Sequence, residues 1–124
     1  MDNTFDKSLV LSRQTAIDDL FHGGKRVRNS VFTIIHQKAP LIEVPFQVLI
    51  SVPKRNIKKA VNRNYLKRCI REVIRKRKTL LIQTNHSADS TTLYAVVYNS
   101  TQKLGFSDLE KHLIHLFNKI QDSK

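Results

Sequence analysis

The sequence predicts an α+β protein, a two-layer α/β sandwich in which amphipathic helices pack on a small sheet. Three observations support this prediction: the chain has 124 residues, 40% of them are hydrophobic, and helix-like and strand-like segments follow one another without a repeat or linker. The length favours one domain over residues 1–124, with flexible tails expected at 1–8 and 121–124. The predicted order is helix, strands, helix, strand, helix.

The first predicted helix covers residues 11–24. Ser12 is its candidate N-cap, and the adjacent glycines Gly23 and Gly24 can end it. Its apolar side chains share one face: Ile17, Leu20 and Phe21. The helix is therefore expected to be amphipathic.

Three segments have strand character. Residues 31–36 are rich in β-branched and aromatic side chains, and residues 93–98 form another short apolar segment. Residues 46–52 alternate, with every second side chain apolar. A proline-bracketed loop is expected at 39–45 and a polar loop at 83–92.

Two more helices complete the prediction. The last one covers residues 107–120 and opens with Ser107 and Glu110, the spacing of a capping box. Its apolar stripe is Leu109, Leu113, Leu116, Phe117 and Ile120. The other helix is long and basic and runs to about Lys78, with an apolar stripe of Leu66, Cys69, Ile70, Val73 and Ile74. Both stripes must face the core, so Cys69 is interpreted as a buried structural thiol.

The positive charge of the chain is concentrated on the basic helix. The chain has a formal net charge of +12, and the window from Lys54 to Lys78 holds 12 basic residues and one acid, Glu72. The positions that remain outside the apolar stripe are Arg63, Asn64, Lys67, Arg68, Arg71, Arg75 and Lys78. Like charges four residues apart weaken a helix, and a solvated charged face would interleave acids. The pattern therefore indicates a surface that binds the phosphates of a polyanion.

Two sequence segments then show a resemblance to a known family. Residues 51–55 read SVPKR, and residues 60–72 read AVNRNYLKRCIRE. Together they resemble the signature of the protein subunit of bacterial ribonuclease P, which has an Arg-Asn-Arg core, a Lys-Arg pair and a further arginine on one helix. The first helix with its following turn and the segment 104–110 also resemble the family. The resemblance covers about residues 9–120.

The resemblance implies a function. The family's enzyme is a ribonucleoprotein endonuclease that removes the 5′ leader from precursor tRNA, and its RNA subunit is the catalyst. This chain would be the accessory subunit, with the catalytic RNA and precursor tRNA as partners and no further protein partner required. Mg²⁺ would be bound mainly by the RNA. The implied fold has the order αβββαβα, a small mixed sheet and a left-handed βαβ crossover, against the general right-handed rule.

The resemblance also implies two sets of site residues. Catalytic RNA would be bound by Lys54, Arg55, Lys58, Lys59, Arg63, Asn64, Lys67, Arg68, Arg71 and Arg75. A leader-binding cleft between the first helix and the sheet would be formed by Arg13, Phe21, Lys25, Arg28, Asn29 and Thr33. Arginine and lysine contacts to phosphates position a protein without reading sequence. Phe21 could stack on an unpaired base, and a core position fits it equally well.

The sequence departs from the family pattern at several positions. Tyr65 replaces the third residue of the Arg-Asn-Arg core, Ser30 replaces an arginine, and 58–59 are lysines where Gly-Asn is usual. Ile17 and Ile35 occupy cleft positions that are commonly aromatic, and an aliphatic side chain cannot stack as a ring does. Nearby cations can replace the lost charges: Arg28, Lys58 and Lys59.

Other functions fit the sequence less well. A self-sufficient protein nuclease needs clustered carboxylates or a histidine-based pair, and His112 and His115 lack a third ligand, so no catalytic or metal-binding residue is expected. A structural or ribosomal RNA-binding protein remains the alternative, and DNA binding is a weaker one.

A membrane-surface helix would need an exposed apolar face. No segment approaches the roughly 20 apolar residues of a membrane span, and no signal-peptide core is visible. A cytoplasmic protein without a membrane partner is therefore expected, and one cysteine fits a reducing compartment.

Overall fold

The computed structural model describes residues 9–40, 44–79 and 90–122. Its helices and strands follow the predicted order. The first strand, β1, is implied by the family resemblance and is not located by the hydrophobic periodicity. The elements are α1 (Gln14–Gly23), β1 (Lys25–Arg28), β2 (Phe32–Pro40), β3 (Phe46–Ser51), α2 (Ala60–Lys76), β4 (Ser90–Tyr98) and α4 (Phe106–Asp122). The α+β class and the order αβββαβα are confirmed.

One mixed sheet organises the fold. Its strand order is β1-β2-β4-β3, in which β1 and β2 pair antiparallel, β2 and β4 pair antiparallel, and β3 and β4 pair parallel. The parallel pair requires a crossover connection, and α2 lies within it. This is the βαβ unit for which the resemblance implies the uncommon left-handed sense.

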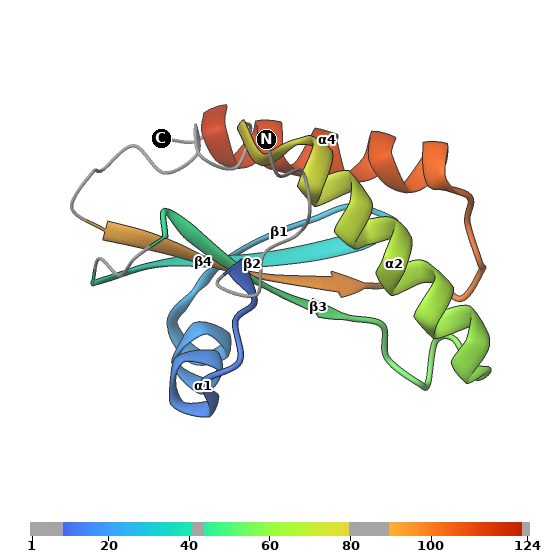
Figure 1. The fold of residues 1–124 in the computed structure, drawn as a ribbon, viewed down its shortest axis with the longest axis horizontal. Coiled ribbons are helices and arrows are strands. Elements are labelled where there is room, and N and C mark those ends of the chain that lie inside the picture. Colours follow the sequence, from blue (N-terminus) through green and yellow to red (C-terminus); the bar gives the residue numbers. More distant parts are fainter. Residues whose placement is uncertain (1–8, 41–43, 80–89, 123–124) are drawn as a thin grey trace.

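The helices are divided between the two faces of the sheet. Figure 1 shows α2 and α4 together on one face and α1 on the other. The larger core lies under α2 and α4, where Tyr94 and Phe117 meet edge to face with ring centroids 5.5 Å apart. A smaller cluster under α1 contains Leu20, Ile35 and Ala95. The sheet with α2 and α4 forms the predicted two layers, and α1 covers part of the free face.

The start of α1 differs from the prediction. Arg13 rather than Ser12 is the N-cap, and it makes no side-chain cap hydrogen bond. The predicted first turn is not helical because the chain there lies against β3: Leu11 is 1% exposed and its backbone N–H donates to the Val48 carbonyl at 3.0 Å. The predicted end is confirmed, since the Gly24 N–H caps the helix on the Leu20 carbonyl.

Strands β2 and β4 are longer than the sequence predicts. The antiparallel ladder between them continues as far as the pair Pro40 and Ser90. The loops predicted at 39–45 and 83–92 are therefore wrong where they overlap these strands, and much of both loops lies outside the described residues. The pairing itself overrides the proline and serine signals, because a backbone ladder accepts polar residues and an edge proline at its end.

Helix α4 also extends beyond its predicted limits. It begins at Phe106, so Ser107 lies inside the first turn, and Glu110 pairs with Arg77 at 3.4 Å instead of closing a capping box. The helix continues to Asp122, two residues into the tail expected at 121–124. Its predicted apolar stripe is confirmed, since all five members are buried: Leu109, Leu113, Leu116, Phe117 and Ile120. Within the described residues, no helix is long and apolar enough to cross a membrane.

Candidate RNA-binding surface

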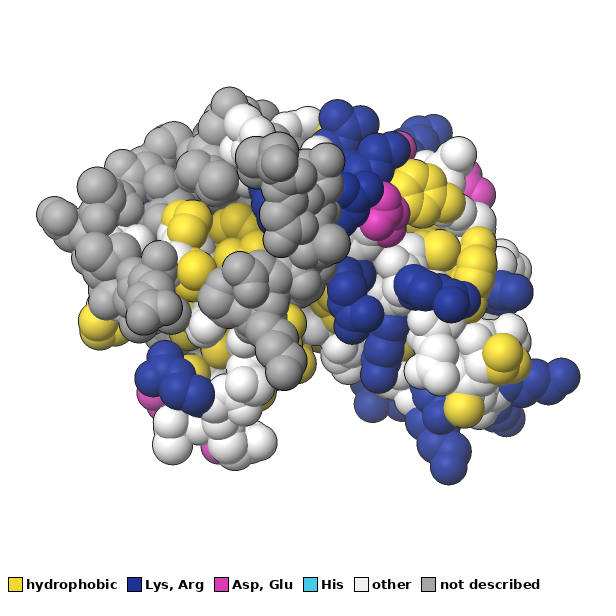
Figure 2. Space-filling view, viewed as in Figure 1, with side chains coloured by type: hydrophobic (Ala, Val, Ile, Leu, Met, Phe, Trp, Pro, Cys, Tyr) yellow, Lys and Arg dark blue, Asp and Glu magenta, His cyan; other side chains and the backbone are white. Residues whose placement is uncertain are grey.

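Helix α2 turns one face to the core and the opposite face to solvent. Leu66, Ile70, Val73 and Ile74 are each at most 1% exposed, as their spacing predicts. Their burial against the sheet fixes the rotation of α2 about its axis and directs the intervening positions outward. Figure 2 shows Lys and Arg side chains gathered over the part of the molecule where Figure 1 places α2.

The outward cations form what we call the α2 basic face. Its members on α2 and the segment before it are Lys54, Arg55, Lys58, Lys59, Lys67, Arg68 and Arg71. All are exposed except Lys67, which is half-buried. Among the described residues none of the seven has an ion-pair or hydrogen-bond partner for its side chain. These charges are therefore available to an external anion.

The first turn of α2 adds backbone donors to this face. Lys59 is the N-cap, with no side-chain cap hydrogen bond, and no acidic residue lies in the first turn. The positive end of the helix dipole favours a phosphate here, and so do the backbone N–H groups of Ala60 and Val61, which have no partner among the described residues. Asn64 is exposed on the next turn, where its amide can donate and accept.

Arg63 forms hydrogen bonds within the protein, unlike Arg55, Arg68 and Arg71. Its side chain is half-buried, and Nη1 donates to the Ile57 carbonyl at 3.0 Å and to the Lys58 carbonyl at 2.7 Å. These bonds hold the segment that enters α2 and carries Lys58. Arg63 thus positions the segment of the α2 basic face that carries Lys58.

Arg75 is also engaged within the protein. Its guanidinium forms a two-point ion pair with Glu72, in which Nε donates to Oε1 at 2.9 Å and Nη2 to Oε2. The hydrogen bond from Arg75 lowers the pKa of the Glu72 carboxyl and the same bond raises the pKa of Arg75. Because the one acid of the basic window is paired on the last turns of α2, the N-terminal half of the α2 basic face keeps its full positive charge.

Cys69 is half-buried, and not buried as its place on the stripe predicts. Its neighbour one turn earlier is Tyr65, which is also half-buried and packs at the margin of the larger core. A hydrogen bond between these two side chains raises the pKa of the Tyr65 phenol, so the phenol is neutral at physiological pH. The pair borders the α2 basic face.

The predicted leader-binding residues fall partly together on the other face of the sheet. Phe21 is half-buried and packs with the cluster that contains Ile35. The register pairs Arg28 with Thr33, two residues along the strands from Ile35, so their side chains share the face that α1 covers in part. Thr33 Oγ1 accepts from the Asn99 amide at 2.7 Å. Lys25 and Arg28 are exposed at the two ends of β1.

Asn29 is a structural residue rather than a free cleft residue. Its Oδ1 accepts from the backbone N–H groups of Val31 at 2.9 Å and Phe32 at 2.8 Å, and its Nδ2 donates to the His112 carbonyl at 3.1 Å. These bonds close the β1–β2 turn and tie it to α4. The side-chain amide therefore has little capacity left for a ligand.

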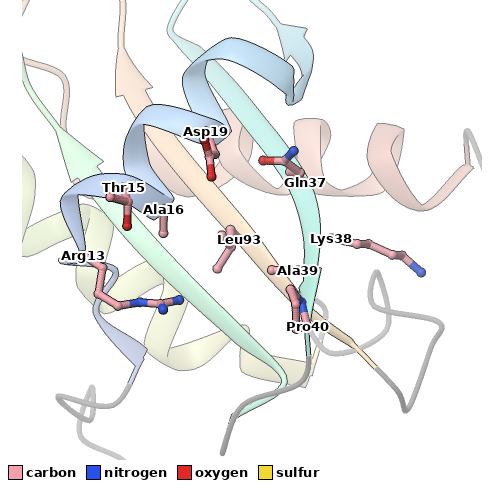
Figure 3. Close-up of a pocket in the computed structure, with 9 residues that line it drawn as sticks. All are labelled: Arg13, Thr15, Ala16, Asp19, Gln37, Lys38, Ala39, Pro40 and Leu93. Atoms are coloured by element: carbon pink, nitrogen blue, oxygen red, sulfur yellow. The ribbon is translucent and has the colours of Figure 1, made fainter.

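Arg13 lies at the opposite end of α1 from Phe21. It lines a cavity of about 340 Å³ together with Thr15 and Ala16 of α1, the end of β2 and Leu93 of β4, and Figure 3 shows these side chains. Ala39, in the same lining, is six residues from Thr33 along β2, which corresponds to about 20 Å. The six predicted leader residues therefore do not converge on one point.

Sequence reasoning missed two cations near these surfaces. Arg26 is exposed and donates from Nη2 to the Phe21 carbonyl at 2.9 Å. Lys103 lies between β4 and α4 in sequence, with its Nζ 4.5 Å from the centroid of the Tyr65 ring. Neither belongs to the basic window, and only the three-dimensional contact reveals them. Among the described residues, no group of three or more His, Cys, Asp and Glu side chains could hold a metal ion.

The geometry defines a small α+β protein with a cationic helix face whose seven outward cations have no partner among the described residues, a surface that suits a polyanion. The family model for ribonuclease P matches residues 5–121. The chain belongs to the ribonuclease P protein family, because that match covers nearly its whole length.

Relatives of known sequence agree with this assignment. The chain is 38% identical over 71 residues to a protein from Buchnera aphidicola named ribonuclease P protein component, and 33% identical over 87 residues to one from Chlorobium phaeobacteroides with the same name. The aligned parts cover 57% and 64% of this chain and 61% and 57% of those relatives. The chain thus spans less than two thirds of their length.

Solved structures show the same fold. The RNase P protein of Staphylococcus aureus superposes with a TM-score of 0.70 at 22% identity, over 91% of this chain and 95% of that one. The RNase P protein of Thermotoga maritima gives a TM-score of 0.71 at 21% identity, over 89% and 96%. The predicted fold and family are both confirmed.

Proposed function

We propose that this protein is the accessory subunit of ribonuclease P, which binds a catalytic RNA and promotes removal of the 5′ leader from precursor tRNA. The observation that carries the proposal is the α2 basic face, whose cations have no partner among the described residues. A face selected for stability alone would pair them with acids, as Arg75 is paired with Glu72. Phosphates of a folded RNA satisfy these charges.

The two faces of the sheet suggest two separate binding surfaces, one for the catalytic RNA and one for the leader. The α2 basic face, on one side, would hold the catalytic RNA. The face under α1, with Phe21, Thr33 and Arg28, would receive the single-stranded leader, where an aromatic ring can stack on a base and cations can meet phosphates. The protein would thereby position the precursor on the RNA and supply no reacting group.

Magnesium belongs to the RNA in this proposal. Mg²⁺ prefers oxygen ligands and is commonly held by phosphates, and the described residues offer no carboxylate cluster that fits it. Bound to the RNA, it would supply activation of the attacking water and stabilisation of the leaving oxygen. The cytoplasm, where precursor tRNA is made in bacteria, is the proposed location.

The protein alone is expected to cleave nothing. The test mixes purified protein with a bacterial ribonuclease P RNA and precursor tRNA at low magnesium, where the RNA alone should be slow. We expect cleavage at the mature 5′ end only when the RNA is present, at a rate that the protein raises. Magnesium-dependent cleavage by RNA-free protein, surviving removal of contaminating nucleases, would overturn the proposal.

Phe21→Ala is expected to weaken binding of leader-containing precursor while leaving binding of mature tRNA nearly unchanged. Only the precursor offers an unpaired base, and loss of one stacked base costs about 1–3 kcal/mol. The affinities of the holoenzyme for the two RNAs measure the effect. Leu49→Ala is the matched control, because Leu49 is also partly buried in this cluster and is not among the predicted leader-binding residues. Equal losses for both RNAs, or a large drop in melting temperature, would assign Phe21 to the core instead.

A further inference from the structure

Lys103 lies against helix α2 although it is far from α2 in sequence. Its ammonium nitrogen is 4.5 Å from the centroid of the Tyr65 ring, within the range of a cation–π contact. Lys103 is exposed, and Tyr65 is half-buried. The ring therefore fixes the direction of the lysine without removing its charge from solvent.

The segment that carries Lys103 is held on both sides. Before it, the buried Tyr98 donates its hydroxyl to the Gln102 carbonyl at 2.6 Å, and the Gln102 N–H donates to Ser100 Oγ at 3.1 Å. After it, the half-buried Leu104 packs against the larger core. The backbone of Lys103 is thus anchored, and the cation–π contact with Tyr65 anchors its tip.

The position of Tyr65 places this charge beside the α2 basic face. Arg68 follows Tyr65 by three residues and is close enough for its charge to act on the phenol. Among the described residues, Lys103 has neither an acidic partner nor a hydrogen bond.

We propose that Lys103 is a phosphate-binding residue of the RNA surface, held in place by the Tyr65 ring. The inference rests on the proposed binding of RNA by the α2 basic face. Lys103 would extend that surface from α2 to the segment before α4. Tyr65 acts as a positioning residue, and Lys103 makes the contact.

The test measures affinity for ribonuclease P RNA as a function of salt. Lys103→Ala should flatten the plot of log affinity against log salt by up to about 0.9, or about 0.7 for single-stranded contacts, and lower affinity about eightfold near ~0.1 M salt. Tyr65→Leu should reproduce part of this loss, whereas Tyr65→Phe, which keeps the ring, should not. In the Tyr65→Leu background, Lys103→Ala should cost clearly less than in the native protein.

The controls separate this inference from the proposed function. Lys119→Ala removes one exposed charge from α4 and should leave the slope nearly unchanged. If Arg68→Ala flattens the slope and Lys103→Ala does not, Lys103 is no part of the surface although α2 binds RNA. If neither changes it, the proposed function fails. Equal costs of Lys103→Ala in the native and Tyr65→Leu backgrounds would contradict the positioning role of the ring.

Discussion

Joint replacement of Arg68 and Arg71 by alanine is expected to weaken binding of catalytic RNA about 60-fold near ~0.1 M salt. Each arginine that neutralises one phosphate releases condensed counterions, which is worth about eightfold at that salt concentration, and two separate contacts multiply. The salt slope should fall by up to about 1.8 for a duplex. Both residues are exposed and point away from the buried stripe of α2, so the melting temperature should not change.

Two other substitutions serve as controls for that result. Lys119→Ala removes a charge from α4, outside the α2 basic face. Arg75→Ala removes an arginine of α2 whose guanidinium is paired with Glu72, so it should cost less than Arg68→Ala. If Lys119→Ala changes the slope as much as Arg68→Ala does, the protein attracts RNA by its net charge alone and the assignment of the surface is wrong.

Asn29→Ala is expected to lower the free energy of unfolding by about 2–4 kcal/mol, since it leaves two backbone N–H groups and one carbonyl without their partner. The N–H groups belong to Val31 and Phe32, which are 5% and 0% exposed, so water does not replace the lost bonds freely. Denaturant titration followed by circular dichroism measures the change.

Arg28→Ala is the matched control, because Arg28 precedes Asn29 in the chain and is exposed with no side-chain partner among the described residues. Its stability should stay within about 0.5 kcal/mol of the native value. Asn29→Asp keeps the acceptor for the two N–H groups and loses only the donor to His112, so it should destabilise less than Asn29→Ala. A stable Asn29→Ala variant that binds leader poorly would restore Asn29 to the leader cleft.

The fold was predictable wherever a periodic apolar pattern coincides with burial. Leu66, Ile70, Val73 and Ile74 follow helical spacing, and all four are buried, so the orientation of α2 could be read directly from its sequence. The ends of β2 and β4 could not be predicted from the sequence. Pro40 and Ser90 are strand residues only because they pair with each other in the ladder between the two strands. Strand ends are set by pairing across the sheet, which local composition does not encode.

The candidate site was predictable in its charge and not in its hydrogen bonds. Sequence identified Lys67, Arg68 and Arg71 because their helical spacing opposes the apolar stripe, and the family resemblance added the cations that precede α2. It could not show that Arg63 bonds to two carbonyls or that Asn29 closes a turn, since those partners depend on local backbone geometry. Lys103 was missed because it joins Tyr65 across the tertiary fold, outside the basic window.

Site-specific cross-linking tests the central claim most directly, which is that the α2 basic face lies against the catalytic RNA. Val61 suits the experiment because it is 71% exposed, lies two turns before Arg68 on the same side of α2, and carries no charge. A Val61→Cys variant in a Cys69→Ser background would carry a photoactivatable group, with Asn118→Cys on α4 as the control. We predict cross-links to ribonuclease P RNA from position 61 and few from position 118. Equal yields from both positions, or cross-links from 118 alone, would contradict the account.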